Sequence, residues 1–105
     1  MRKYIYVCSP LKGDIEGNRN KAIKYCSHVA DQGHIPIAPH VYFTTFLDDR
    51  NKDHRALGLA FGLDILKKCD ELWIFGDHIS DGMRAEILWW SENKSTDSLR
   101  LESGC

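Results

Sequence analysis

The hydrophobic residues form two patterns that alternate along the chain. Short, nearly continuous apolar runs occupy residues 3–8, 34–38 and 71–75, and each ends at serine, proline or glycine. Such runs are typical of strands buried on both faces of a parallel sheet. Longer segments at 18–32, 53–68 and 81–93 predict helices between and after them. Alternating strands and helices indicate an α/β fold.

We therefore expect a small Rossmann-like three-layer sandwich, with a parallel sheet of about four strands and helices on both faces. Pro36 removes a hydrogen-bond donor from the second strand, which we expect to be very short or at an edge of the sheet. Residues 39–49 predict either a short helix or an ordered loop over a pocket. Asp53 is the expected N-cap of the following helix. Gly58 and Gly62, four residues apart, would let another element or a ligand approach that helix closely.

The length of 105 residues suits one domain. We expect this domain to span residues 1–94. Residues 95–105 form a polar tail, with a candidate short strand at 98–102.

The net charge and the hydropathy of the chain disfavour some classes of binding partner. Fourteen Lys and Arg residues nearly balance fifteen Asp and Glu residues, for a net charge of −1. Binders of duplex nucleic acid or membrane surfaces normally carry a basic excess. No apolar run approaches the roughly 20 residues that span a bilayer. We therefore expect a soluble cytoplasmic protein that binds neither duplex nucleic acid nor a membrane.

Cysteines and histidines are not spaced as metal ligands. The four cysteines include no C-x-x-C pair, and the five histidines form no H-E-x-x-H motif. We expect no metal and no organic cofactor. We predict that three of the cysteines are small core residues and that Cys105 is a thiol on the tail. His40, directly after a strand and beside Tyr42, is a candidate to recognise a base or share a proton.

Ligands of open parallel sheets bind at the carboxyl ends of the strands. We expect residues 9–14, 39–42 and 76–82 to converge there. In the first loop, Ser9, Lys12, Gly13 and the amino end of the next helix suit a phosphate, although a plain surface turn is the alternative.

Glu86 is the principal candidate in the third region. It lies about one turn into the last helix, where the helix dipole favours an ionised carboxylate, as a nucleophile requires. The alternative is an exposed helix glutamate that pairs with Arg84 or Lys94. Of the neighbouring Trp89 and Trp90, we expect one ring in the core and the other at a subunit contact.

Residues 6–13, YVCSPLKG, together with residues 80–87, SDGMRAEI, resemble the nucleoside 2-deoxyribosyltransferase-like superfamily. This superfamily includes the 2′-deoxynucleoside 5′-monophosphate N-glycosidases. To about residue 92 the chain is similar to a branch of short bacterial and phage proteins. The signatures of that branch, S-P-x-x-G, I-P-I-A-P-H and G-D-x-I-S-x-G-M-x-x-E-I, are found here at 9–13, 35–40 and 76–87.

The resemblance implies roles for individual residues. Glu86 matches the family's nucleophile, and Tyr6 matches a tyrosine that positions it. Lys12 stands where the monophosphate glycosidases carry an arginine for the 5′-phosphate, and Ser80 matches a residue that binds the sugar or its phosphate. The expected substrate-binding residues are Ser9, Pro10, Lys12, Gly13, His40, Ser80, Gly82 and Met83.

Two departures from the family pattern concern catalysis. The family's enzymes carry an aspartate eight residues before the position of Asp70, where this chain has Gly62, and the nearest carboxylate is Asp64. The C-terminal region, which in the family completes a neighbouring subunit's site, is here a short polar tail. Asp77, His40 and Asp64 remain candidates for the general acid, with Asp77 preferred.

Two functions follow as expectations. The first is cleavage or transfer at the N-glycosidic bond of a (deoxy)nucleoside or nucleoside 5′-monophosphate, with Glu86 as nucleophile. The alternative is a non-catalytic protein of the same fold that binds a nucleotide or sequesters a nucleotide signal. A purely structural role through Trp89 and Trp90 is a third. In each case we expect a homodimer or larger homo-oligomer.

Overall fold

The computed structural model describes residues 1–48 and 50–102, and four parallel strands in these ranges form one sheet. The sheet order is β2-β1-β3-β4. The strands are β1 (Tyr4–Cys8), β2 (Ile35–Ile37), β3 (Glu71–Ile74) and β4 (Leu99–Leu101). Central β1 pairs with both β2 and β3, as in the pair of Val7 with Trp73. The predicted parallel sheet of about four strands is confirmed.

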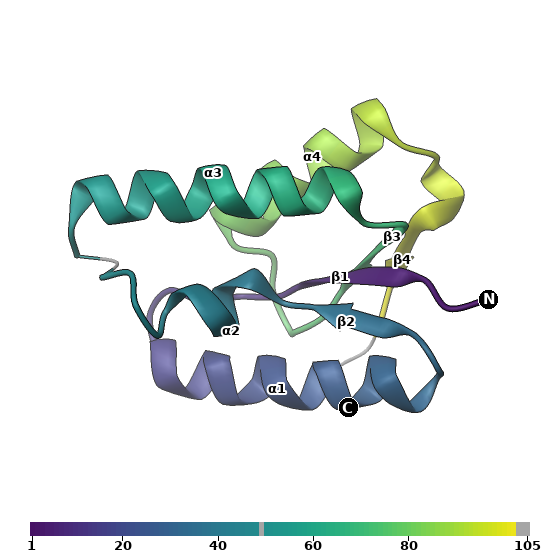
Figure 1. Ribbon diagram of the computed structural model, residues 1–105, viewed down its shortest axis with the longest axis horizontal. Coiled ribbons are helices and arrows are strands. Elements are labelled where there is room, and N and C mark those ends of the chain that lie inside the picture. The colour runs from purple at the N-terminus through teal and green to yellow at the C-terminus, as the bar shows by residue number, and fades with distance from the viewer. Residues whose placement is uncertain (49, 103–105) are drawn as a thin grey trace.

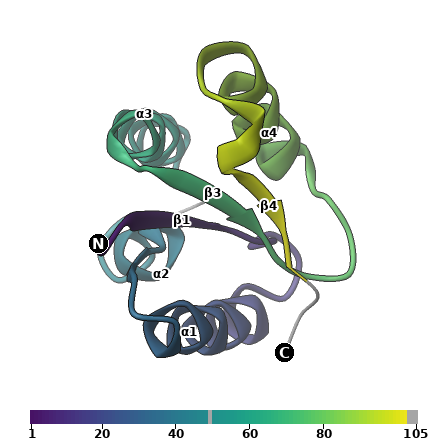
Figure 2. The same cartoon turned by 90° about the vertical axis from the view of Figure 1, so that its right-hand side faces the viewer.

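Helices cover both faces of this sheet (Figures 1 and 2). Helices α3 and α4 lie over one face, and α1 and α2 lie on the other. Their bounds are α1 (Ile15–Asp31), α2 (Pro39–Phe43), α3 (Lys52–Lys68) and α4 (Asp81–Asn93), with a 3-10 turn, η1, at Thr96–Ser98. This is the expected three-layer sandwich. None of the described helices is long and apolar enough to cross a membrane.

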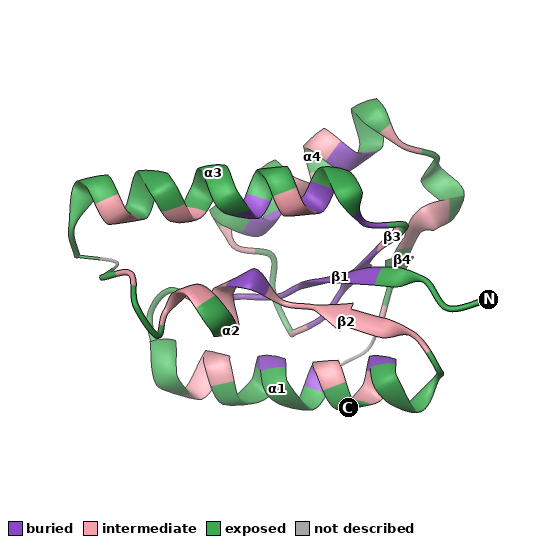
Figure 3. Cartoon of the chain, in the orientation of Figure 1, coloured by how far each residue is buried: buried purple, intermediate pink, exposed green. Residues whose placement is uncertain are grey.

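Alternation along β1 divides the core into two clusters, because successive strand side chains point to opposite faces. Ile5 and Val7 point toward α1, and Tyr6 and Cys8 point toward α3 and α4. Figure 3 shows the buried residues concentrated along the central strands β1 and β3 and on the inward sides of the helices. Tyr6 and Cys8 therefore lie on the same side of the sheet as α4.

Of the local predictions made from the sequence, the short edge strand is confirmed and the helix cap is not. The Pro36 strand is three residues long and at the sheet edge, as expected. The ambiguous segment after it begins as the short helix α2. The predicted Asp53 cap is wrong: the Asn51 side chain accepts hydrogen bonds from the N–H groups of Asp53 and His54. Asp53 instead lies in the first turn, where a negative charge also favours the helix.

The segment after residue 94 contributes to the sheet. Its strand β4 pairs with β3, and the Trp90 indole N–H donates to the Ser98 hydroxyl at 2.8 Å. Trp90 is fully buried, whereas Trp89 is half-buried. Cys8 and Cys69 are core residues as expected, Cys26 is half-buried, and Cys105 lies outside the described residues.

Candidate active site

The loops after β1, β2 and β3 meet at one end of the sheet. The Ser9 hydroxyl, after β1, lies 2.9 Å from Nε2 of His40, after β2. Pro10 packs against Gly76, after β3, so closely that a Cβ on this glycine would lie 3.0 Å from Pro10 Cδ. Gly76 also has φ +103°, a conformation that L side chains rarely adopt. The predicted convergence of the three strand ends is therefore present.

Helix α4 brings Glu86 to this end of the sheet. The Tyr6 hydroxyl donates a hydrogen bond to Oε2 of Glu86, and the Cys8 thiol donates to Oε1 at 3.5 Å. Both donors come from the same face of β1. The glutamate is half-buried, and this environment differs from the exposed alternative with Arg84 or Lys94 as partner. Lys94 instead donates to the carbonyls of Lys67 and Cys69.

Burial and hydrogen bonding oppose each other at this carboxyl group. Burial raises the pKa of Glu86, while the hydrogen bonds from Tyr6 and Cys8 lower it without cancelling the increase. Burial, which raises the pKa, therefore outweighs the ionised state that the position in the helix predicted for Glu86. Burial and the nearby Glu86 also raise the pKa values of Tyr6 and Cys8, which keeps both groups protonated as donors.

His40 is a neutral hydrogen-bonding group in this site. Burial lowers its pKa to about 4, so the imidazole carries no charge at neutral pH. One ring nitrogen contacts the buried Ser9 hydroxyl, and the Thr44 hydroxyl donates to the His40 carbonyl at 2.9 Å. This arrangement suits recognition of a neutral polar group.

The candidates for the general acid are less well placed. Asp77 is exposed, and its carboxylate lies 2.8 Å from Nδ1 of His78, which lowers the pKa of Asp77. A general acid must hold a proton at the working pH, so these features disfavour the role. Asp64 is exposed on α3 and lies 4.0 Å from the Lys67 ammonium.

Gly62 is buried, and a Cβ at this position would lie 3.6 Å from the Tyr6 hydroxyl. The predicted close approach to this helix is therefore made by Tyr6.

Several predicted binding residues have structural roles. The Ser80 hydroxyl caps α4 by accepting from the Met83 N–H at 3.3 Å. The Met83 side chain is 2% exposed and packs in the core with Tyr6 and Cys8, which leaves it little surface for a ligand. Gly82 is exposed, with open space where a side chain would begin.

The first loop is less suited to phosphate than its sequence indicated. Lys12 and Gly13 are exposed, and Gly13 has φ +93°. The Asp14 side chain caps α1 by accepting from the Gly17 N–H at 3.0 Å. A carboxylate at this helix start takes up a backbone donor and repels an anionic group.

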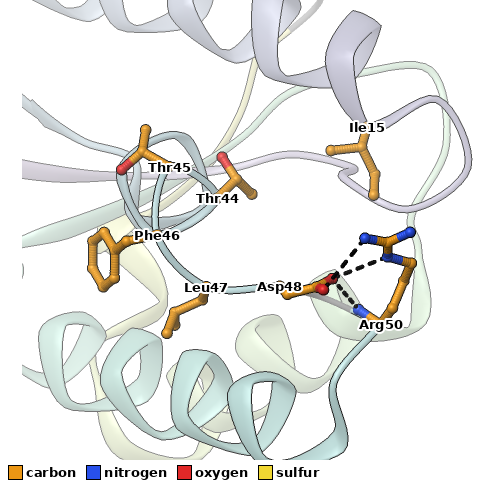
Figure 4. A pocket seen from close by; sticks show the side chains of 7 residues that line it. All are labelled: Ile15, Thr44, Thr45, Phe46, Leu47, Asp48 and Arg50. Atoms are coloured by element: carbon orange, nitrogen blue, oxygen red, sulfur yellow. Dashed lines mark hydrogen bonds and ion pairs between the residues drawn. The ribbon is translucent and has the colours of Figure 1, made fainter.

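A cavity of about 430 Å³ lies between the start of α1 and the segment that joins α2 to α3 (Figure 4). The bonded pair of Asp48 and Arg50 forms one side of it. Thr44, which lines the cavity, is the residue that donates to the His40 carbonyl. The cavity's lining residues Thr44–Asp48 lie in the segment 39–49, for which an ordered loop over a pocket was one of the two alternatives predicted from the sequence. Within residues 1–48 and 50–102, no group of three or more His, Cys, Asp or Glu side chains could hold a metal ion.

Residues 3–97 match a family described as a domain of unknown function, DUF7768. The chain belongs to the DUF7768 family. A search of curated proteins gave no match for this DUF7768 chain.

A solved structure shares the fold of the DUF7768 chain. It is a 2-deoxyribosyltransferase from the psychrotolerant bacterium Bacillus psychrosaccharolyticus, described as a biocatalyst for the synthesis of nucleosides. The match has a TM-score of 0.72 and 20% sequence identity, and covers 95% of this chain and 72% of that one. The predicted resemblance is thus confirmed for the fold, which is that of a 2-deoxyribosyltransferase.

Proposed function

We propose that this protein cleaves or transfers the N-glycosidic bond of a (deoxy)nucleoside, with Glu86 as nucleophile. The observation that carries the proposal is the Glu86 carboxylate, held by Tyr6 and Cys8 at the carboxyl ends of the strands. Its fold is also that of a 2-deoxyribosyltransferase.

The reaction follows a double displacement at C1′ of the sugar. A Glu86 oxygen forms a bond to C1′ as the bond from C1′ to the base nitrogen breaks. The electron pair of that bond leaves with the base, which is protonated from solvent. Water, or a second base, then attacks C1′, loses a proton, and releases Glu86 as a carboxylate.

The remaining site residues favour an uncharged substrate. The neutral pair of Ser9 and His40 offers hydrogen bonds to a sugar hydroxyl or a base edge. Asp14 disfavours a 5′-phosphate at the start of α1. We therefore propose a nucleoside in preference to its 5′-monophosphate, with Lys12 and Gly13 at the margin of the site.

The assembly proposed for this protein is a homodimer or larger. Helix α3 leaves large apolar side chains exposed in the single chain. They are Leu57, Leu59, Phe61 and Leu63. A second copy of the chain would remove these side chains from water. Sedimentation equilibrium should show an oligomer, and a monomer at all concentrations would contradict it.

A second candidate is non-catalytic binding of a nucleoside or nucleotide. Two observations favour it: Gly62 supplies no carboxylate beside Tyr6, and the exposed Asp77 is already paired with His78. Such a protein would return its ligand intact after long incubation.

Chromatography of released base separates the two functions. The purified protein would be incubated with deoxynucleosides, ribonucleosides and their 5′-monophosphates, with and without an added acceptor base. We expect base release from nucleosides that is abolished in Glu86→Ala. Turnover that persists in this variant would refute Glu86 as nucleophile, and intact substrate throughout would favour binding alone.

A further inference from the structure

The two oxygens of the Glu86 carboxylate have different donors. Tyr6 donates an O–H to Oε2, whereas Cys8 donates an S–H to Oε1. Cys8 is the last residue of β1 and is fully buried. Since residues 6 and 8 point to the same face of the strand, the backbone of β1 sets the spacing of both donors.

One donor is not enough to fix a carboxylate. The last torsion of a glutamate side chain is broad, so a single hydrogen bond leaves the carboxylate plane free to turn. A second donor on the other oxygen removes that freedom. Cys69 is another thiol of the same core, and its S–H does not share a carboxylate with a second donor. It donates to the Ile65 carbonyl within its own helical turn, at 3.4 Å.

We propose that Cys8 is a positioning residue, whose thiol fixes Oε1 of Glu86 while Tyr6 fixes Oε2. The carboxylate then presents one orientation at the end of the strand. The contact does not depend on the proposed function, whereas its effect on turnover rests on that function.

Titration of Glu86 in the free protein tests the contact directly. Its carboxyl carbon, labelled with ¹³C and assigned with Glu86→Gln, would be followed by NMR against pH. Cys8→Ala and the bulkier Cys8→Val both remove the donor, so the titration midpoint should rise by about half a pH unit. Cys8→Ser restores a donor and should leave the midpoint at or below its original value.

Cys69→Ala is the matched control, because it removes a buried thiol of the same core whose hydrogen bond goes to the Ile65 carbonyl. Its midpoint should not move. An unchanged midpoint in folded Cys8→Ala and Cys8→Val would overturn the proposal. So would an equal rise in Cys8→Ser.

Base release supplies a second measurement. In Cys8→Ala, kcat should fall roughly tenfold or more with KM nearly unchanged, and Cys8→Ser should recover most of it. If the unaltered protein releases no base, the proposed function fails, and the NMR midpoints still decide whether Cys8 holds Glu86.

Discussion

The Tyr6 hydroxyl donates to Glu86, a residue 80 positions later in the chain. Tyr6 lies in the central strand and Glu86 in the last helix, so the contact exists only when α4 is docked on the sheet. Each residue also changes the ionisation of the other. Burial together with the carboxylate raises the pKa of Tyr6, and the hydroxyl lowers that of Glu86 against the larger effect of burial.

Tyr6→Phe should therefore shift the ionisation of Glu86. Loss of the donor favours the protonated carboxyl, so the acidic limb of the pH profile of base release should move to higher pH. We expect kcat at neutral pH to fall by roughly tenfold to a hundredfold. A profile that coincides with that of the unaltered protein would show that the hydroxyl does not act on Glu86.

Glu86→Gln should stabilise the fold at neutral pH. A carboxyl whose pKa is raised in the folded state destabilises that state as pH rises through the ordinary carboxyl range toward the folded pKa. A neutral amide avoids this cost, so the free energy of unfolding at neutral pH should increase. Urea unfolding at pH 7 and near pH 4 measures it. The gain should shrink at the lower pH, and a gain independent of pH would exclude the ionisation mechanism.

His40 should make the fold sensitive to acid. Its folded-state pKa of about 4 lies below the ordinary value of 6.5, so stability present above pH 6.5 is lost as pH falls toward 4. His40→Gln should lose about 2 kcal/mol less than the unaltered protein over this range. Urea unfolding at pH 6.5 and at pH 4 measures this difference, and equal losses in His40→Gln and the unaltered protein would contradict the prediction.

Asp14→Asn tests the preference for an uncharged substrate. Asparagine caps helices about as well as aspartate, so α1 should remain capped while one negative charge is removed. The KM for a deoxynucleoside 5′-monophosphate should fall roughly two- to fivefold, with the KM for the nucleoside unchanged. Equal changes for both substrates would show that Asp14 does not face the 5′ position.

The sequence by itself determined the layers of this protein and the region of its candidate site. Continuous apolar runs identified three strands, because burial on both faces leaves no polar positions. Their carboxyl ends indicated where Ser9, His40 and Gly76 would meet, since parallel strands end at one edge of the sheet. Pro36 indicated the edge strand through its missing donor.

Only the tertiary structure decided which side chains act on one another. The sequence predicted Asp53 as the cap of α3, whereas the backbone at the start of the helix puts Asn51 in that position. The sequence predicted Cys8 only as a core residue. In the structure, the docking of α4 places Glu86 against its thiol. The pKa of Glu86 depends on burial and on two donors nearly 80 residues away in the chain. Hydrophobic periodicity indicates which face of a helix or strand is buried, but it does not identify the residue that this face contacts across the core.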